Sequence, residues 1–573
     1  MPTPASSRNI SKSPLGTPAT SPDEWVSRIR KGIIGEGSAI PGPFGPRPLV
    51  YADYTASGRA LAMIEDAIRQ HALPYYGNTH TETSFTGMYT TRLRESARQA
   101  VREAVGAGPE HAVIFTGSGA TAAIDRFSRI MGLQQRFEAD SIDRPVMFIG
   151  PFEHHSNELM WRETGVELVS IPLDEYGLPC FAVLEERLKE YAHHSLKIVS
   201  FSAASNVTGV ITDVRRLARL THAYGGVVAC DYAASGPYVP IDMSASSNDA
   251  DDHLDAIFLS PHKFIGGPDT SGVLVIRRDQ CTNAVPGLAG GGTVSYVTAD
   301  EHHYVADPQR REEAGTPGIV QDIRTGLVFT LKSRVGAQHV ASLEGALVDK
   351  AIEQWKGIDN LHILGPLDTP RLGIFSFNIS AGPRMIHHNL VVAMLNDLFG
   401  IQARGGCSCA GPYGHELLGI GPELANQHAA LVLEGKSLYR PGWARLGFNY
   451  FFNDESACYI IDAVNFIARH AAVLMRLYSV DVQGGVWRAR DAAPFHDMLS
   501  LEDMLDSATP FEKNSPPDFA QCFVEAQALV ETAQATAIDP TPPLTSAAEE
   551  ALRWFWWPHE SIEAATAQAE MTP

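Results

Sequence analysis

Lys263, in the segment SPHKFIGG, has the setting best suited to covalent chemistry. The chain has ten lysines, and this is the only one between Lys197 and Lys332. It follows the apolar run DAIFLS and precedes two glycines, which predicts a tight turn at the end of a strand. A lysine amine in such a turn can form an imine with an aldehyde cofactor. The alternative is a solvated loop lysine without a chemical role. The residues around Lys263 therefore have to distinguish the two interpretations.

An aldehyde cofactor such as pyridoxal phosphate (PLP) requires three further groups, and the chain offers a candidate for each. Gly119, Ala120 and Thr121 follow the strand-like HAVIFT and begin a helix, whose free N–H groups can bind a phosphate. Asp231 ends the strand-like GVVACD, and a carboxylate there can keep the pyridine nitrogen protonated. His154, in FEHHSNE, can stack on the cofactor ring. The order of these residues along the chain predicts a PLP site more strongly than any one of them.

Each of these residues also has an ordinary structural explanation. A Gly-rich turn can be a simple connection, Asp231 can cap a helix, and a histidine pair after a strand can be structural. The HHSNE segment could also bind a metal, but no third ligand has convincing spacing. Cys407, Cys409 and His415 lack the usual four-ligand pattern as well. The sequence therefore predicts no metal site.

Strand-like apolar runs alternate with helical segments over residues 46–335, which predicts one large PLP-binding domain. The runs HAVIFTG, PVMFIG, LKIVSFS, GVVACD, DAIFLS and SGVLVIRR are apolar almost throughout, as expected of strands buried on both faces. Strands and helices at this spacing predict an α/β fold with a mainly parallel sheet. Open sheets of this kind bind ligands at the carboxyl ends of their strands, where the candidate residues lie.

The remaining residues divide into three predicted parts: 1–45, 336–480 and 481–573. A helical stretch over residues 321–355 links the large domain to the second of these. Residues 336–480 contain the strand-like LGIFSFNI and WARLGFNYF and a helix over 388–399, which predicts a smaller α+β domain. Residues 481–573 are interpreted as an accessory helical extension. Residues 1–45, rich in Ser, Pro and Thr at their start, are interpreted as a disordered leader.

The composition excludes several functions. The formal net charge is −21, from 66 acidic and 45 basic residues, which argues against nonspecific binding to nucleic acid or to an anionic membrane. No stretch approaches the roughly 20 apolar residues of a membrane span. The seven cysteines are scattered, which argues against a disulfide framework and favours the cytoplasm. Organelle targeting by the N-terminal segment is the alternative location.

Taken in order, the motifs resemble those of the class V aminotransferase family of fold type I PLP enzymes, and most closely the cysteine desulfurases and selenocysteine lyases. The resemblance spans about residues 48–470. GSGAT matches the family's phosphate turn, EHHSN the segment whose first histidine stacks on the ring, and SPHKF the lysine motif. The resemblance implies that Ser260 and His262 contact the phosphate and that Lys263 carries the cofactor. It also implies that Asn206, in SNVTG, lies near the cofactor's phenolic oxygen or the substrate.

The resemblance also implies substrate and subunit contacts. YADYTASGR is similar to a loop on the substrate side. Arg445, in ARLGFNYF, lies where the family binds the substrate α-carboxylate, which a guanidinium group can bind through two parallel hydrogen bonds. Arg404 is similar to a second active-site arginine, although either arginine could instead form a surface ion pair. EAGTP matches a segment that reaches the partner subunit's phosphate, which implies that Thr316 acts in trans in a homodimer.

One position departs from the family pattern. The family usually has D-x-A-Q or D-x-A-H, in which a polar side chain contacts the phenolic oxygen of PLP. This chain has Asp231, Tyr232, Ala233 and Ala234, and an alanine cannot make that hydrogen bond. Tyr232 or Asn206 could compensate. The loss leaves the reaction open between desulfuration and another class V reaction on an amino acid, namely C–S lysis, epimerisation or transamination.

The Gly-rich segment ARGGCSCAGPYGHE supplies the thiol that desulfuration requires. In desulfurases, a loop cysteine attacks the sulfur of L-cysteine, and a persulfide and L-alanine result. The family's nucleophile follows the loop arginine by five residues, which points to Cys409, and a similarity of RGGCSC to molybdenum-cofactor sulfurases favours the same residue. Cys407 is the rival, and both thiols could be structural. A sulfur-acceptor protein is then an expected partner, and a degenerate PLP-fold binding protein is the alternative from another class.

Overall fold

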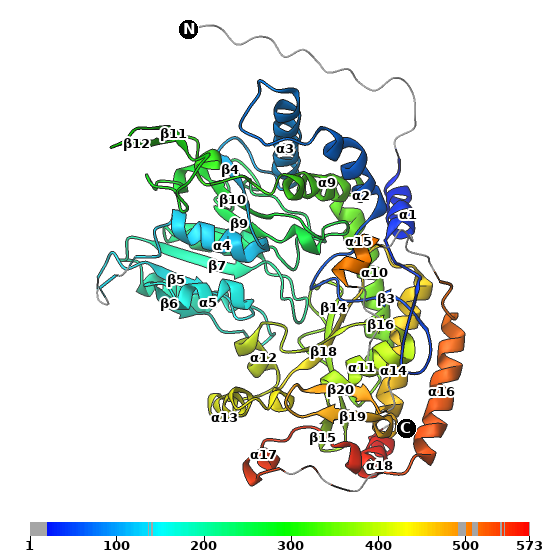
Figure 1. Cartoon of the computed structure of the whole chain (residues 1–573). Helices are drawn as coiled ribbons and strands as arrows, with labels where there is room; N and C mark the ends of the chain where they lie inside the picture. Colours follow the sequence, from blue (N-terminus) through cyan, green and yellow to red (C-terminus); the bar gives the residue numbers. More distant parts are fainter. Residues whose placement is uncertain are drawn as a thin grey trace.

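The larger of two domains is built on a sheet with the strand order β4-β10-β9-β8-β7-β5-β6 (Figure 1). The computed structural model describes residues 20–571 except 136, 139–140, 491–499, 507–513, 539–540, 542 and 544. The strands of this sheet are β4 (His111–Thr116), β5 (Val146–Ile149), β6 (Glu167–Ser170), β7 (Lys197–Ser202), β8 (Val227–Asp231), β9 (Ala256–Leu259) and β10 (Gly272–Arg277). Strands β5, β6, β7, β8 and β9 are mutually parallel, and β10 runs antiparallel to its neighbours β9 and β4. The predicted mainly parallel sheet is confirmed.

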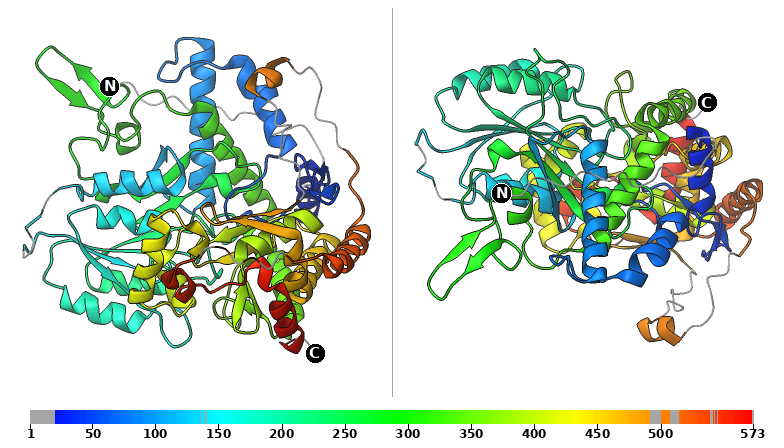
Figure 2. Two further views of the ribbon diagram at one scale, coloured as in Figure 1. Left: turned by 60° about the horizontal axis from the view of Figure 1, so that its bottom comes forward. Right: turned by 90° about the horizontal axis from the view of Figure 1, so that it is seen from above.

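Alternate residues of each strand face two different cores, which explains why the strand sequences are apolar almost throughout. On β5, Val146 and Phe148 face one core, and Met147 and Ile149 face the other. Helices cover both faces of the sheet (Figure 2). The first face is covered by α3 (Phe85–Ala104), α6 (Phe181–Glu190) and α7 (Val214–Ala223), and the second by α4 (Gly119–Ile130) and α5 (Leu159–Arg162). The sheet is therefore fixed on both sides, and its carboxyl edge is left for a site.

The helical stretch predicted over residues 321–355 is two helices, α9 (Ile319–Val335) and α10 (Ala337–Trp355). They meet at Gly336, whose φ of +87° lies in a region that glycine adopts at little cost. Helix α9 packs along α3 of the large domain, whereas α10 contacts α14 (Asp454–Leu474) of the smaller one. The break at Gly336 is therefore the link between the two domains.

The smaller domain contains an antiparallel sheet in the order β13-β14-β18-β17, with β15 paired to β14. Its strands are β13 (Leu361–Ile363), β14 (Ile374–Ala381), β15 (Arg384–Ile386), β17 (Arg404–Gly406) and β18 (Trp443–Gly447). Helices α11 (His388–Phe399) and α14 pack on this sheet around Phe375 and Leu446. The segment Asp454–Leu477 is long and apolar enough to cross a membrane, but 67% of its most apolar window is buried. Its composition is therefore that of a central core helix.

The segment after residue 480 completes the core of the smaller domain. Its described elements are β19 (Tyr478–Asp481), β20 (Val486–Ala489), α15 (Leu501–Asp506), α16 (Phe519–Ala535), α17 (Ala547–Ala551) and α18 (Ser561–Met571). Trp487, Cys522 and Phe555 are buried in the same cluster as the sheet residues. Arg47, which is buried, donates to the Glu525 carboxylate at 2.6 Å. Apart from the β19–β20 hairpin, the described part is helical, and it is packed into the domain rather than appended to it.

The disordered leader predicted over residues 1–45 is wrong from residue 20 onward, and residues 1–19 lie outside the described part of the chain. Helix α1 (Pro22–Gly32) is capped by Ser21, whose hydroxyl accepts the Glu24 N–H. Val26 and Ile29 of this helix are buried against α9. A capping serine, an acidic first turn and an apolar i, i+3 pair are helix signals that the analysis of composition missed.

A buried ion-pair network anchors the segment that precedes Thr316. The Glu313 carboxylate accepts from Arg94 at 2.5 Å and from Arg98 at 2.7 and 3.0 Å, and Arg94 also donates to Asp322 at 2.5 Å. These four side chains are at most 8% exposed. Burial alone would raise the pKa of Glu313, but Arg98 and Arg94 outweigh it and lower the pKa to about 2.

Replacing Glu313 with glutamine is expected to lower the free energy of unfolding by about 3 kcal/mol, because two buried guanidinium groups lose the buried counter-charge that they share, and keep only Asp322 and Glu95. Since the folded pKa of Glu313 lies below its usual 4.5, its stabilisation is present above pH 4.5 and is lost as the pH falls towards 2. Urea unfolding measures both effects. In the control Glu95→Gln, a 55% exposed partner of the same Arg98 is changed, and we expect a loss below about 1 kcal/mol. Equal losses in the two variants would contradict the assignment.

Candidate active site

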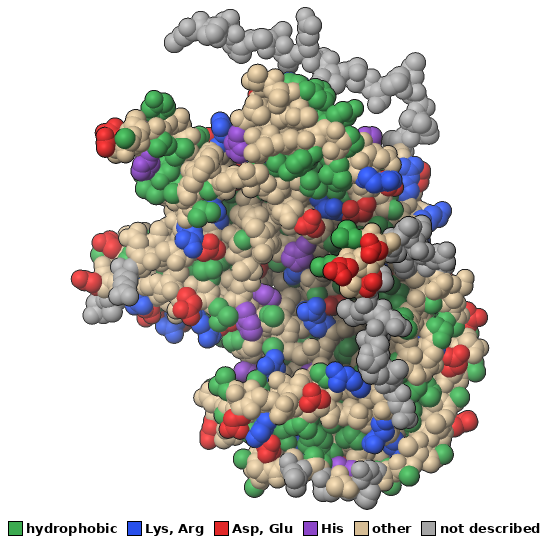
Figure 3. All heavy atoms as spheres, in the orientation of Figure 1, with side chains coloured by type: hydrophobic (Ala, Val, Ile, Leu, Met, Phe, Trp, Pro, Cys, Tyr) green, Lys and Arg blue, Asp and Glu red, His purple; other side chains and the backbone are tan. Residues whose placement is uncertain are grey.

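A cavity of about 240 Å³ lies between the two domains, at the carboxyl edge of the large sheet. Figure 3 shows a hollow on this face, with histidine and basic side chains visible in it. Most of the residues predicted for the site line the cavity: Ala120, Thr121, His154, Asn206, Asp231, Ser260, His262, Lys263, Arg404, Cys409 and Arg445. The sheet brings them together because β5, β7, β8 and β9 are parallel neighbours that end at the same edge.

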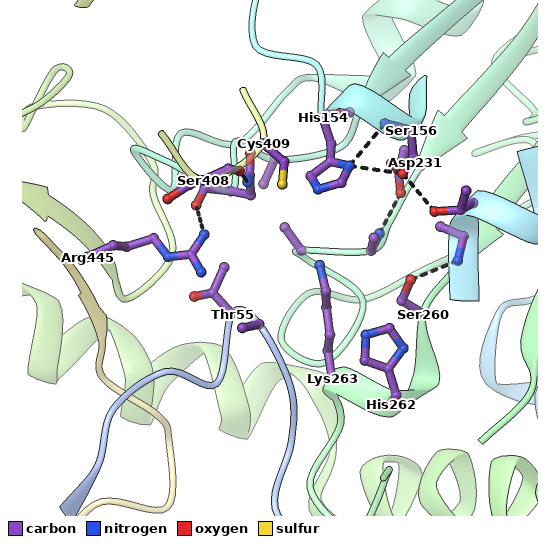
Figure 4. Close-up of a pocket in the computed structure, with 18 of the residues that line it drawn as sticks. Thr55, His154, Ser156, Asp231, Ser260, His262, Lys263, Ser408, Cys409 and Arg445 are labelled. Atoms are coloured by element: carbon purple, nitrogen blue, oxygen red, sulfur yellow. Dashed lines mark hydrogen bonds between the residues drawn. The ribbon is translucent and has the colours of Figure 1, made fainter. Parts of the chain in front are cut away.

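Lys263 ends a short 3-10 turn, Pro261–Lys263, directly after β9, and its amine projects into the cavity (Figure 4). Burial lowers the pKa of Lys263 to about 8, and the positive charge of Arg445 acts in the same direction, against Asp231. Burial raises the pKa of Asp231, whose carboxylate accepts the Ala233 N–H at 2.8 Å. A lysine with a low pKa beside a buried carboxylate is suited to form a covalent bond with an aldehyde.

The amino end of α4 forms a turn suited to bind an anion at one end of the cavity. Gly119 has a φ of +57°, and a Cβ added to it would lie 2.8 Å from Ser260 Oγ and 3.1 Å from the His262 ring, so only glycine fits. The Ala120 N–H donates to Ser260 Oγ at 2.8 Å. Burial and the neighbouring Lys263 lower the pKa of His262 to about 4. Free N–H groups of a helix and a serine hydroxyl are suitable donors to a phosphate.

His154 is held by a chain of hydroxyl groups on the opposite side of the cavity from Lys263 (Figure 4). The Ser156 N–H donates to His154 Nδ1 at 3.1 Å, and Ser156 Oγ lies 3.1 Å from the same nitrogen and 2.7 Å from Thr121 Oγ1. Burial and Lys263 lower the pKa of His154 to about 3. The ring is therefore neutral and oriented, with its proton on Nε2.

The two residues that could compensate for Ala234 lie in different places. Ala234 lines the cavity, and so does Asn206. Tyr232, by contrast, is 3% exposed and packs in the core with Phe264, away from this cavity. Within the described residues, Asn206 Oδ1 is buried without a hydrogen-bond partner. Of the two residues, Asn206 is therefore the one with a polar side chain at the cavity.

Two arginines approach the cavity from the smaller domain, and Asp53 joins them. Arg445, on β18, is 4% exposed and donates to Asp53 Oδ1 at 3.2 Å and to Asn206 O at 3.1 Å. Arg404, on β17, donates from Nε to Asp53 Oδ2 at 3.0 Å. Strand β3 (Val50–Tyr51) pairs in parallel with β16 (Ile401–Gln402). Asp53 follows β3 and Arg404 follows β16, and this pairing brings the two side chains together. Arg445 is thus buried at the cavity, whereas Arg404 lines the cavity with 54% of its side chain exposed.

Cys409 and Cys407 have different surroundings on the loop between β17 and α12 (Gly411–Leu417). Cys409 lines the cavity, and its sulfur points towards the His154 ring (Figure 4). Cys407 is half-buried and packs against an apolar cluster that contains Phe152 and Trp443. The placement of Cys409 agrees with the predicted nucleophile.

Thr316 lies away from the cavity of its own chain, and several polar residues that were not predicted line that cavity. Thr316 is exposed, and it is not among the described residues that line the cavity of its own chain. Ser118, which belongs to the predicted phosphate turn, does line it, and so do four polar residues that the sequence did not single out: Thr55, Ser156, Ser202 and Ser408. The signal available for Ser156 is its position inside the motif that holds His154.

One cluster outside the cavity has spacing suited to a metal ion. Among the described residues, His222, His253 and Asp255 form the one such group. It lies at the amino end of β9, and His222 Nε2 and Asp255 Oδ2 are 2.9 Å apart, the distance of an ordinary hydrogen bond. The cluster is therefore separate from the chemistry of the cavity.

A mainly parallel sheet, a lysine turn after β9, a carboxylate at the end of β8 and a phosphate turn before α4 define a fold type I PLP enzyme. The chain belongs to the aminotransferase class-V family, whose model matches residues 50–421. It is 28% identical over 369 residues to a probable cysteine desulfurase of Halalkalibacterium halodurans, covering 64% of this chain and 85% of the relative. It is 29% identical over 378 residues to a cysteine desulfurase of Haloferax volcanii, covering 65% and 83%.

Solved structures show the same fold. A cysteine desulfurase from Thermococcus onnurineus superimposes with a TM-score of 0.60 at 24% identity, covering 73% of this chain and 94% of that one. The cysteine desulfurase CsdA from Escherichia coli superimposes with a TM-score of 0.59 at 21% identity, covering 77% and 97%. The fold class predicted from the sequence is confirmed.

The residues present fit PLP. A Cβ would fill the space at Gly119, the buried Asn206 Oδ1 has no partner within the described residues, and Asp231 accepts only from Ala233 there. The Lys263 amine likewise has no hydrogen-bond partner among those residues. Lys263 would hold the aldehyde carbon, Asp231 the pyridine nitrogen, and the turn before α4 the phosphate.

The rate at which the apoprotein takes up PLP is expected to rise with pH and to level off above pH 8. The neutral amine is the nucleophile, and burial has brought the pKa of Lys263 down from 10.5 to about 8. Rapid mixing of apoprotein with PLP between pH 6.5 and pH 10, followed by visible absorbance, measures the midpoint. A midpoint near pH 10, as for a free lysine, would contradict the buried setting of Lys263.

Proposed function

We propose that the protein is a PLP-dependent cysteine desulfurase, which takes sulfur from L-cysteine as a persulfide on Cys409 and releases L-alanine. The observation that carries this proposal is that Cys409 lines the same cavity as Lys263 and Arg445 (Figure 4). An aminotransferase needs no thiol at this position, whereas sulfur transfer requires one. The names of the relatives, cysteine desulfurases, support the same reaction.

Arg445 is suited to bind the substrate. Its guanidinium group is 4% exposed, and its Nε is buried without a partner among the described residues. The α-carboxylate of an amino acid can accept from this group in place of water. Asp53, held between Arg445 and Arg404, balances part of their positive charge and fixes the orientation of both. The amino acid would thus be held by its carboxylate at the edge of the smaller domain.

Proton movements fall to Lys263 and His154. Bound PLP would supply an electron sink for the pair left at the substrate α-carbon when its proton is removed. The Lys263 amine, with a pKa of about 8, is suited to remove that proton and to return it. The neutral His154 ring carries its proton on Nε2, because Nδ1 accepts from Ser156, and can donate it on the other side.

Sulfur transfer then uses Cys409. Its thiolate attacks the sulfur of the bound cysteine, and a sulfur–sulfur bond forms as the bond between that sulfur and the substrate β-carbon breaks. The electron pair of the broken bond remains with the carbon skeleton, which takes up a proton and leaves as L-alanine. A thiol reductant or an acceptor thiol removes the outer sulfur from Cys409 and regenerates the enzyme.

The assembly and surroundings of the enzyme are part of the proposal. We propose a homodimer, supported by the exposure of Thr316 outside its own cavity and by the exposed apolar side chains of Tyr75, Tyr76 and Phe85. A sulfur-acceptor protein would meet the Cys409 loop. All seven cysteines lie in the described part of the chain and are free, which supports function in a reducing compartment such as the cytoplasm.

The direct test is a product assay on the purified holoenzyme. With L-cysteine and a thiol reductant, we expect L-alanine and sulfide in equal amounts, and without reductant a single persulfide on the peptide that contains Cys409. A panel of other sulfur and selenium amino acids then defines the substrate class. Absence of alanine, with cofactor bound, would overturn the proposal.

A second candidate reaction has one observation in its favour. Ala234 presents a methyl group to the cavity where the family usually has a polar side chain. A weakened contact to the cofactor favours C–S lysis, racemisation or transamination of another amino acid. A keto acid or a racemised product, formed without persulfide, would identify this reaction instead.

A further inference from the structure

The backbone that carries Cys409 has an unusual conformation. Ser408 and Cys409 have φ angles of +51° and +56°, in the left-handed region. This conformation is unfavourable for a residue other than glycine, because Cβ crowds the following carbonyl. Two in succession persist only where contacts from outside the loop hold them. Groups outside the loop must therefore supply those contacts.

Three hydrogen bonds from the large domain hold this loop. The His155 N–H donates to Cys409 O at 2.8 Å, and the Gly411 N–H donates to His155 Nε2 at 3.0 Å. Asn206 Nδ2 donates to Ser408 O at 2.7 Å. His155 follows β5 and Asn206 follows β7, whereas the loop lies between β17 and α12 of the smaller domain. The contacts therefore bridge the two domains beside the cavity.

His155 makes two of these contacts, one at Cys409 and one two residues after it. Its backbone fixes the carbonyl of Cys409 itself, and its ring fixes the first residue of α12, two positions later. A Cβ added to Gly411 would lie 3.3 Å from His155 Nε2, so a glycine at this position lets the ring approach closely. With both ends held, the Cys409 side chain is directed into the cavity, towards His154 (Figure 4).

We propose that the His155 ring is a positioning residue that keeps the Cys409 loop docked over the cavity during sulfur transfer. Its consequence for turnover rests on the proposed desulfurase function, whereas docking itself does not. The side chain that faces the cofactor and the side chain that holds the nucleophile loop are then adjacent, His154 and His155. The distance between the cysteine and the substrate would be set by the same short segment that orients the ring of His154.

The test compares two replacements of His155. His155→Phe keeps a flat ring without Nε2, so the Gly411 N–H loses its acceptor, whereas the side-chain oxygen of His155→Gln can accept in place of Nε2. In His155→Phe we expect amide hydrogen exchange of Gly411 to accelerate about tenfold or more, since its half-buried N–H loses the acceptor that protects it. We expect kcat for alanine release to fall about tenfold, with KM nearly unchanged because Arg445 is untouched.

Controls separate docking from general damage. His193→Phe makes the same change at an exposed histidine before β7, and neither the exchange at Gly411 nor kcat should change. The cofactor absorbance checks that each variant is folded, and His155→Ala replaces His155→Phe should the latter fail to fold. His155→Gln should restore both readouts towards wild type.

Several outcomes would overturn the proposal. Unchanged exchange and unchanged kcat in His155→Phe would show that the ring does not hold the loop. Faster exchange with unchanged kcat would show that docking does not serve the reaction. Equal defects in His155→Gln and His155→Phe would show that the acceptor is not what matters. Should the wild type release no alanine, the proposed function fails, and the exchange experiment still decides whether His155 docks the loop.

Discussion

Replacing Cys409 with serine is expected to reduce alanine and sulfide release from L-cysteine by about 10³-fold or more, to background. The hydroxyl group is nearly the same size as the thiol, so the loop and the cavity should be unchanged. A serine oxygen, however, is a far weaker nucleophile towards sulfur, and a residue that forms the covalent intermediate is not replaced by its neighbours. The measurement is turnover of L-cysteine, with the visible absorbance of the cofactor recorded on the same sample.

The matched control is Cys407→Ser, which makes the same change two residues away. Cys407 packs against the apolar cluster that contains Phe152 and Trp443, and it is not among the described residues that line the cavity. We expect turnover close to wild type and a loss of stability of about 1 kcal/mol, because a hydroxyl group enters a half-buried apolar contact. Full turnover in Cys409→Ser, or loss of turnover only in Cys407→Ser, would overturn the assignment of the nucleophile.

The second large effect is expected for Lys263→Ala. This variant should lose the absorbance of covalently held cofactor. Its turnover of L-cysteine should fall by about 10³-fold or more, because a positioned acid–base group contributes about 10²–10⁴-fold. The phosphate turn and Asp231 remain, so PLP can still bind noncovalently. Equilibrium dialysis with free PLP measures that residual binding.

Lys350→Ala serves as the control for a lysine of the surface. Lys350 pairs with Asp454 at 2.8 Å, away from the cavity, and its removal should leave absorbance and turnover unchanged. If Lys263→Ala retained the covalent absorbance, another lysine would carry the cofactor. Lys332 would then be the next residue to test, because it is also buried and burial lowers its pKa to about 7.

Much of the large domain could be predicted because short-range sequence patterns determine it. GVVACD and DAIFLS are apolar runs that end in polar residues, and the sheet places those ends, Asp231 and Ser260, side by side. The helix predicted over residues 388–399 has those limits in the structure. Local patterns were misleading where a single residue changed the outcome, as at Gly336, which divides one predicted helix into two.

The contacts that complete the site could not be predicted because they join distant parts of the chain. Asp53 meets Arg404 and Arg445 across 351 and 392 residues, and His155 meets Gly411 across 256. No spacing rule links such positions, since the relative placement of the two domains decides which loops face each other. The role of α1 was missed for a simpler reason, because a leader rich in Ser and Pro precedes a short amphipathic helix.

The C-terminal segment has a consequence for the order in which the protein can fold during synthesis. The last strand of the large sheet ends at Arg277, and α9, which covers it, ends at Val335. The core of the smaller domain, in contrast, includes Ala564 of α18. Domains fold as units as the chain emerges from the ribosome. The large domain can therefore form first, whereas the half of the active site that carries Arg445 and Cys409 must wait until α18 (Ser561–Met571) has been synthesised.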